Sequence, residues 1–203
     1  MNDLTVFIES GILELYVMDQ CAPAEKEEVE RMSRLYPQVK EELDIISKAL
    51  EQHDRTHAVT PSETVKPFVM ASIDFIKRMK GGEPATFPPI IHAASLISDY
   101  DAWLNRPDLQ PLAPEENITA RLIGHTPQMT TAIVWIKKST PPEIHTDELE
   151  QFLIVEGTCN IYIGEDVHSL QAGDVLAIPL HTTHRVQITS VLPCKVILQR
   201  IAA

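Results

Sequence analysis

The fold is most strongly indicated by Pro141-Pro142-Glu143-Ile144-His145-Thr146-Asp147-Glu148-Leu149-Glu150, which is followed at a short distance by Gly157. A second stretch runs from Gly173 through Pro179 to His184. Both combine strand-forming residues with Gly or Pro turns, which is typical of short antiparallel strands. Histidine nitrogen and carboxylate oxygen are usual ligands of divalent first-row metals. The two stretches therefore predict a small β-domain that brings two histidines and at least one glutamate to one metal ion.

The surrounding sequence has the same character from Ile118 to the C-terminus. Short β-branched or alternating runs are separated by glycines and prolines, and several such runs at even spacing favour an antiparallel sandwich or barrel. The predicted strands are 118–123, 130–137, 151–155, 160–163, 175–178, 186–189 and 195–201.

The first 80 residues have helical periodicity instead. Val39, Leu43, Ile46 and Leu50 recur at intervals of three or four, which places them on one face of a helix. The pattern predicts helices over 3–20, 23–36, 38–53 and 65–80, with a hinge at 54–64. Residues 81–117 are rich in proline, and they read as a linker and barrel-edge segment with one short helix around 98–104. The predicted domains are therefore 1–80, 81–117 and 118–203.

The composition excludes some classes of function. The chain has 203 residues and a formal net charge of −12. Binding to nucleic acid needs clustered Lys and Arg, so we expect neither direct nucleic-acid binding nor attraction to anionic lipid. Three cysteines without a CxxC pair suit a reducing compartment. The N-terminus lacks the pattern of a signal peptide, and no apolar run has the length of a membrane span. We expect a cytoplasmic protein.

The two stretches resemble the two conserved motifs of the cupin superfamily, which are small jelly-roll β-barrels of the RmlC-like type. The resemblance covers about residues 118–201 and implies an α+β protein with an N-terminal helical bundle and a C-terminal cupin barrel. It implies metal ligation by His145, Glu150 and His184, with Glu143 in the place of the family's first histidine as a fourth ligand. The metal would be a divalent ion, with Zn, Fe, Mn and Ni left open. The chain departs from the motifs at Pro141, His181 and Ile188, which stand where Gly, Gly and Asn are usual.

The helical half is similar to the N-terminal domain of bacterial anti-sigma factors. The matching segments are Glu14 to Val17, Pro23 to Glu30 and Pro37 to Leu43. The cysteines that bind zinc in some members are missing, so no zinc site is expected there. One group, the ChrR type, joins such a domain to a C-terminal cupin. This resemblance implies a transcription regulator whose helical domain binds a sigma factor while the cupin senses a signal.

Two alternatives stay open at this stage. One is a metal-dependent cupin enzyme of dioxygenase or isomerase type, with a small-molecule ligand in the barrel and Glu143 or His181 as acid or base. Only Arg121 and Arg185 are candidates for holding an anionic substrate, and no catalytic residue can be named. The other is a metal-free binding module, in which the barrel forms a homodimer.

Overall fold

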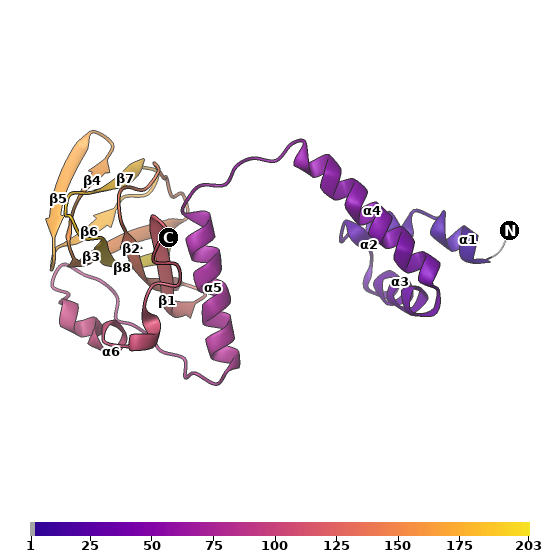
Figure 1. Cartoon of the computed structure of the whole chain (residues 1–203), viewed down its shortest axis with the longest axis horizontal. Coiled ribbons are helices and arrows are strands. Elements are labelled where there is room, and N and C mark those ends of the chain that lie inside the picture. Colours follow the sequence, from indigo (N-terminus) through magenta and orange to yellow (C-terminus); the bar gives the residue numbers. More distant parts are fainter. Residues whose placement is uncertain (1–2) are drawn as a thin grey trace. The chain divides into compact units, whose positions relative to one another are not determined.

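The computed structural model describes residues 3–203, and the chain forms two compact units, one ending at Thr60 and one beginning at Pro61 (Figure 1). The first unit is helical. Its elements within the described residues are α1 (Asp3–Ile8), α2 (Ile12–Val17), α3 (Pro23–Leu35) and α4 (Pro37–Arg55). None of the helices found in residues 3–203 is both long enough and apolar enough to cross a bilayer.

The helix predicted over 3–20 is wrong, because the chain makes two short helices there. Gly11 separates them with a φ of 82°, a left-handed conformation that glycine adopts without steric cost. The predicted helices 23–36 and 38–53 agree with α3 and α4 within two residues. Pro23 and Pro37 begin these helices, where a missing backbone N–H costs least. A small core of Leu13, Val29, Met32 and Val39 holds the unit together.

The second unit is built on two antiparallel sheets. The strands are β1 (Ile118–Thr126), β2 (Met129–Ile136), β3 (Glu148–Glu156), β4 (Thr158–Ile163), β5 (Asp166–Gln171), β6 (Val175–Ile178), β7 (His184–Ile188) and β8 (Cys194–Ala202). One sheet has the order β1-β2-β8-β3-β6 and the other β5-β4-β7. The main core draws on both sheets, with Val134, Phe152 and Leu198 from the first and Ile161 and Val186 from the second.

The antiparallel strands predicted from the sequence are present, with one addition. Strand β5 was missed, because its side chains are mostly exposed and polar and give no apolar alternation. In the part of the chain that is described, the strands form two separate sheets rather than one closed barrel. The core between the sheets is the space in which the predicted ligands meet.

The segment predicted as a linker, 81–117, covers the outer face of the five-stranded sheet. It contains two 3-10 turns, Ile97–Tyr100 and Pro107–Leu109, and α6 (Asp101–Leu104). Its residues Ile91, Tyr100 and Trp103 form a second core with Ile133 and Ile197 of the sheet. Burial of these apolar side chains holds the segment against the sheet, so it is part of the C-terminal unit rather than a spacer.

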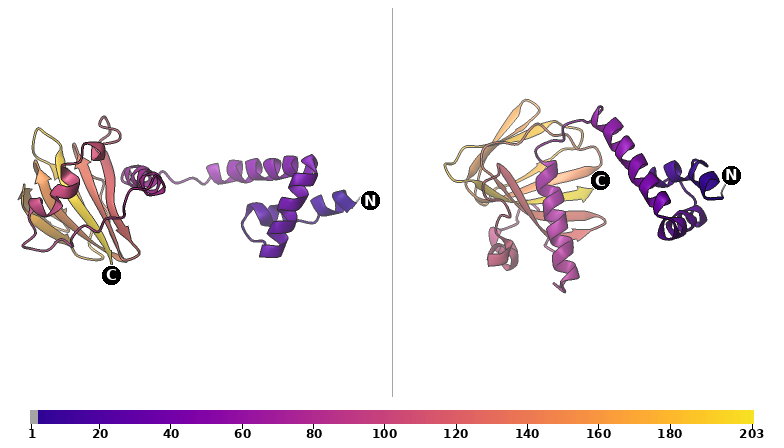
Figure 2. Two further views of the ribbon diagram at one scale, coloured as in Figure 1. Left: turned by 90° about the horizontal axis from the view of Figure 1, so that it is seen from below. Right: turned by 45° about the vertical axis from the view of Figure 1, so that its right-hand side comes forward.

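Helix α5 (Val65–Lys80) also belongs to the C-terminal unit, whereas the sequence analysis assigned it to a helical domain ending at residue 80. It lies beside the strands of this unit (Figures 1 and 2) and packs on β1, with Phe68, Ala71 and Phe75 against the main core. The apolar face of α5 pairs with a strand about 50 residues away in the chain, which local periodicity cannot reveal.

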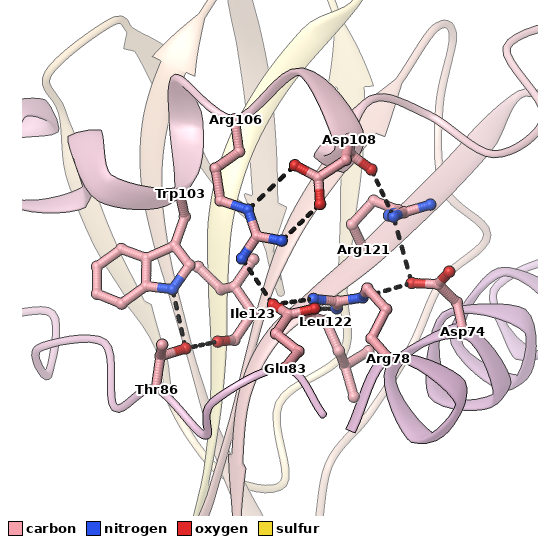
Figure 3. Close-up of polar contacts among 10 residues, drawn as sticks. All are labelled: Asp74, Arg78, Glu83, Thr86, Trp103, Arg106, Asp108, Arg121, Leu122 and Ile123. Atoms are coloured by element: carbon pink, nitrogen blue, oxygen red, sulfur yellow. Dashed lines mark hydrogen bonds and ion pairs between the residues drawn. The ribbon is translucent and has the colours of Figure 1, made fainter. Parts of the chain in front are cut away.

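A network of charged side chains anchors the C-terminal half of α5 (Figure 3). Arg78 contacts Asp74 at 2.9 Å and Glu83 at 2.8 Å, and it also donates to the carbonyl oxygen of Leu122 in β1. Arg106, Asp108 and Arg121 belong to the same network, as Figure 3 shows. Three arginines face three acids, so the network is neutral and its charges are paired, as partly buried ions require.

Candidate metal centre

Four acidic and histidine side chains meet between the two sheets: Glu143, His145, Glu150 and His184. Glu143 and His184 lie directly opposite one another, because their backbones exchange hydrogen bonds of 2.8 and 2.9 Å in an isolated antiparallel bridge. Glu150 projects from β3, where it is paired in register with Ile178 of β6 and Arg200 of β8. The carbonyl oxygen of His145 accepts a hydrogen bond of 2.8 Å from the backbone of His181.

The donor atoms of these four side chains are close enough to share an ion. One ligand atom from each lies within 4.8 Å of the others. Nε2 of His184 is 2.9 Å from Oε2 of Glu150, and Nε2 of His145 is 3.4 Å from the same oxygen. Ligands about 2.1 Å from a common ion are separated by roughly 3–4 Å, so these separations match a coordination site.

The two carboxylate oxygens of Glu150 have different partners. Oε2 faces both histidines, whereas Oε1 accepts a hydrogen bond of 3.0 Å from Nε of Arg200. The residue is only 2% exposed. Burial raises the pKa of Glu150, but contacts from His145, His184 and Arg200 outweigh it and hold the pKa well below its usual range. Glu150 is therefore a carboxylate with one oxygen directed at the two histidines.

His145 provides the observation that tests the fit to a metal. Its Nε2 atom is buried, yet it finds no hydrogen-bond partner among residues 3–203. Its 3.4 Å contact with Oε2 of Glu150 does not have hydrogen-bond geometry, although the Glu150 carboxylate raises the pKa of His145 against the effect of burial. An unpaired buried ring nitrogen is costly unless a ligand completes it. A divalent ion beside Oε2 of Glu150 would do so, and the residues fit one.

Glu143 is held differently from the other three. Its Oε1 accepts a hydrogen bond from the hydroxyl of Thr64, and its Oε2 is 3.6 Å from Arg200. The side chain is 18% exposed, against 2% for Glu150. Glu143 can therefore supply an oxygen from the rim of the site, while His145, Glu150 and His184 form its deeper part.

The charge balance of the site also suits a divalent cation. Two carboxylates face one guanidinium, that of Arg200, so with neutral imidazoles the cluster carries a net charge of about −1. Imidazole suits Zn, Fe and Ni, and carboxylate suits Mn, so the donor set leaves these metals open. Without an ion, the surplus negative charge lies in a mostly apolar surrounding, which disfavours it.

The other side chains singled out from the sequence lie away from this cluster. His181 is exposed and adopts a φ of 58°, a left-handed conformation that glycine adopts without steric cost. Arg121 belongs to the network of α5 and β1, and Arg185 stacks 3.8 Å from the ring of Tyr162. The remaining candidates, His92, His125 and His168, are not part of the four-residue group. Neither predicted arginine reaches the centre.

Three residues at the centre were missed by the sequence reasoning: Thr64, Phe68 and Arg200. Arg200 was detectable, because it continues the inward alternation of Val196 and Leu198 along β8. Thr64 and Phe68 precede Glu143 by more than 70 residues, and no spacing rule connects them. All three line a cavity of about 30 Å³, together with Glu143, Glu150, His184 and apolar core residues.

One protein-family model matches the part of the chain that contains the cluster. Residues 132–199 match the family model of the cupin domain. The cupin segment contains all four clustered side chains, whereas Arg200 and Thr64 lie outside it. No curated protein matches the chain.

Several solved structures are similar to parts of the chain. The cupin domain of Cnp3 from Schizosaccharomyces pombe is 9% identical, with a TM-score of 0.42, over 44% of this chain and 67% of that one. A cupin-2 domain protein from Shewanella frigidimarina is 24% identical, with a TM-score of 0.38, over 41% of this chain and 79% of that one. KdgF from Halomonas sp. is 20% identical, with a TM-score of 0.40, over 45% of this chain and 84% of that one.

Proposed function

We propose that the C-terminal unit binds one divalent metal ion through His145, Glu150, His184 and Glu143, and that it acts as the sensing part of a regulatory protein. The buried Nε2 of His145, which lacks a hydrogen-bond partner within residues 3–203 and lies 3.4 Å from Oε2 of Glu150, carries the metal proposal. When bound, such an ion supplies a Lewis acid with open positions for small ligands.

The size of the cavity favours sensing over turnover of an organic substrate. Its volume of about 30 Å³ has room for only a few water molecules. Its walls are largely apolar, with side chains such as Phe68, Val134, Phe152 and Leu198. Room for an ion and one very small ligand suits a site that responds to metal or to a small reactive molecule.

The helical unit is proposed to bind a sigma factor, as the resemblance to ChrR-type anti-sigma factors implies. Support comes from its surface, since Leu15, Met18, Leu35, Tyr36 and Ile45 are each at least 40% exposed. These exposed apolar side chains are available for contact with a partner. A sigma-factor partner also implies that the protein works in the cytoplasm.

A metal-dependent enzyme is the second candidate function. One observation favours it: a pocket of about 180 Å³ shares the side chains of Phe68, Leu198 and Arg200 with the lining of the 30 Å³ cavity. Movement of Phe68 and Arg200 would join the two spaces and admit a small organic molecule. In that case, turnover would depend on His145 and His184.

Metal analysis of the full chain, purified without added metal, tests the proposal. We expect about one equivalent of a first-row divalent metal, lost in His145→Ala and His184→Ala and kept in His168→Ala, a histidine of β5 outside the cluster. A protein that takes up no metal, even from excess ion, would refute the metal site. The regulatory role is tested by copurification of a sigma factor, and failure of every sigma factor of the host to bind would refute it.

A further inference from the structure

The start of α5 contacts one proposed metal ligand, Glu143, and also Arg200, which orients a second ligand, Glu150. Thr64, the residue directly before α5, donates a hydrogen bond from its hydroxyl to Oε1 of Glu143. Phe68, one turn further on, places its ring 4.7 Å from the guanidinium carbon of Arg200. Thr64 is only 8% exposed, so the first contact is shielded from water.

Arg200 connects Phe68 with the buried ligand Glu150. Its Nε atom donates to Oε1 of Glu150 at 3.0 Å, and its terminal nitrogen lies 3.6 Å from Oε2 of Glu143. Both carboxylates of the site are therefore oriented by groups that touch the first turn of α5. Thr64 and Phe68 also line the 30 Å³ cavity, so they close it on this side.

The two ends of α5 are held with different strength. Near its C-terminal end, Arg78 makes ion pairs with Asp74 and Glu83 and donates to a carbonyl oxygen of β1. Near its N-terminal end, the ion pair between Lys66 and Glu116 is exposed, and exposed pairs contribute little. The first turn is therefore held by the contacts of Thr64 and Phe68 with the metal centre and by the packing of Phe68 on the main core.

We infer that metal binding and docking of the first turn of α5 are linked, with Thr64 and Phe68 acting as positioning residues of the metal site. This inference rests on the proposed metal site. Linkage is reciprocal: if docking of the turn orders Glu143 and Arg200 for the ion, then the ion must hold the turn in place by the same free energy. Groups that orient metal ligands typically change affinity by about 10- to 100-fold.

Helix α5 directly follows the proposed sigma-binding unit in the sequence, so the linkage could connect the metal site with that unit. The compact C-terminal unit begins at Pro61, six residues after α4 of the helical unit ends at Arg55. Thr64 lies just inside this boundary. A change in metal occupancy would therefore loosen or fix the part of the C-terminal unit nearest in sequence to the proposed sigma-binding unit, which is what a sensor requires.

Hydrogen exchange on the full chain, with and without Zn²⁺, tests the linkage directly. We expect the amides of residues 65, 66 and 68–70 to exchange at least several-fold more slowly with Zn²⁺ bound; residue 67 is a proline and has no amide hydrogen. The amides of residues 75–80 should change little, because Arg78 anchors them in either state. Equal exchange of residues 65, 66 and 68–70 with and without bound Zn²⁺ would overturn the inference.

Zn²⁺ release to an excess of chelator tests the two residues. Thr64→Val and Phe68→Ala should each release Zn²⁺ about 10-fold faster than the wild type, while Thr64→Ser, which keeps the hydroxyl, should release it at close to the wild-type rate. Val69→Ala is the matched control, because Val69 is on the same turn and 50% exposed. Thr64→Val keeps the shape of the side chain, so it remains informative if Phe68→Ala folds poorly.

The outcomes separate the inference from the proposed function. One equivalent of Zn²⁺ in every protein, with equal release rates, would overturn the linkage and leave the metal site intact. Failure of the wild type to bind Zn²⁺ would overturn both.

Discussion

Arg200 donates from Nε to Oε1 of Glu150 at 3.0 Å, and this contact leaves Oε2 of Glu150 to face the two histidines. The two residues are also paired in register across β8 and β3, so the backbone fixes their distance. Opposite charges at such a cross-strand position attract one another. The pair thus determines which oxygen of Glu150 is presented to the proposed ion.

Arg200→Met should weaken Zn²⁺ binding by about 10- to 100-fold, because Glu150 would lose the group that orients it. The affinity can be measured by competition with a chromophoric chelator. Arg185→Met is the matched control, since Arg185 stacks on Tyr162 outside the cluster. If both variants bind Zn²⁺ as the wild type does, then Arg200 has no part in orienting Glu150.

His181→Gly should stabilise the C-terminal unit. His181 has a φ of 58°, and a left-handed conformation costs an L-residue with a Cβ atom roughly 1 kcal/mol. Glycine avoids this cost, and the backbone N–H that donates to His145 is kept. Urea unfolding followed by tryptophan fluorescence isolates this unit, because both tryptophans of the chain, Trp103 and Trp135, lie after Pro61. A lower midpoint in the glycine variant would show that the imidazole contributes more than the strain costs.

The sequence was sufficient for the features that local patterns encode. Glycines and prolines separate the strands. The resemblance of the two stretches to the cupin motifs implied a cluster of Glu143, His145, Glu150 and His184, whose ligand atoms lie within 4.8 Å of one another in the structure. Hydrophobic periodicity did not predict where one residue's backbone conformation interrupts a helix. Gly11, with its φ of 82°, divides the helix predicted over 3–20.

Features that depend on distant contacts could not be predicted in this way. Helix α5 is amphipathic in either domain, and only its packing on β1 assigns it to the C-terminal unit. The proline-rich segment 81–117 looks like a linker until its apolar residues are seen on the outer face of the sheet. Thr64 reaches Glu143 across 79 positions of the chain, and no rule of spacing extends so far.

Gly124→Ala should destabilise the C-terminal unit by about 1–3 kcal/mol, the usual range for overpacking. A Cβ atom on Gly124 would lie 2.4 Å from Cδ of Pro88, in the segment that covers the sheet. Gly164→Ala is a useful comparison, because its Cβ would meet open space and only the strain of a φ of 58° would remain. We expect the larger loss for Gly124→Ala in urea unfolding. Equal losses would mean that the 81–117 segment yields to the added methyl group.

The charge network of Figure 3 should make stability depend on pH through Glu83. The hydrogen bond from Arg106 lowers the pKa of Glu83, burial opposes this, and Arg78 lowers the pKa further. Because the pKa in the folded protein is depressed below its ordinary value of 4.5, the contribution of Glu83 to stability is present above about pH 4.5. It is lost as the pH falls through the folded-state pKa.

Glu83→Gln tests this dependence, because the amide keeps the shape of the side chain and cannot ionise. At pH 7 we expect the variant to be less stable by about 1–3 kcal/mol, since Arg78 and Arg106 would lose a charged partner at 2.8 and 2.6 Å. Below pH 4.5, the difference from the wild type should shrink, because the wild-type carboxyl becomes protonated. Urea unfolding by tryptophan fluorescence at a series of pH values measures this difference, with the exposed Glu165→Gln as control. A difference that stays constant from pH 7 to pH 3 would mean that the ionised carboxylate adds nothing to the network beyond its shape.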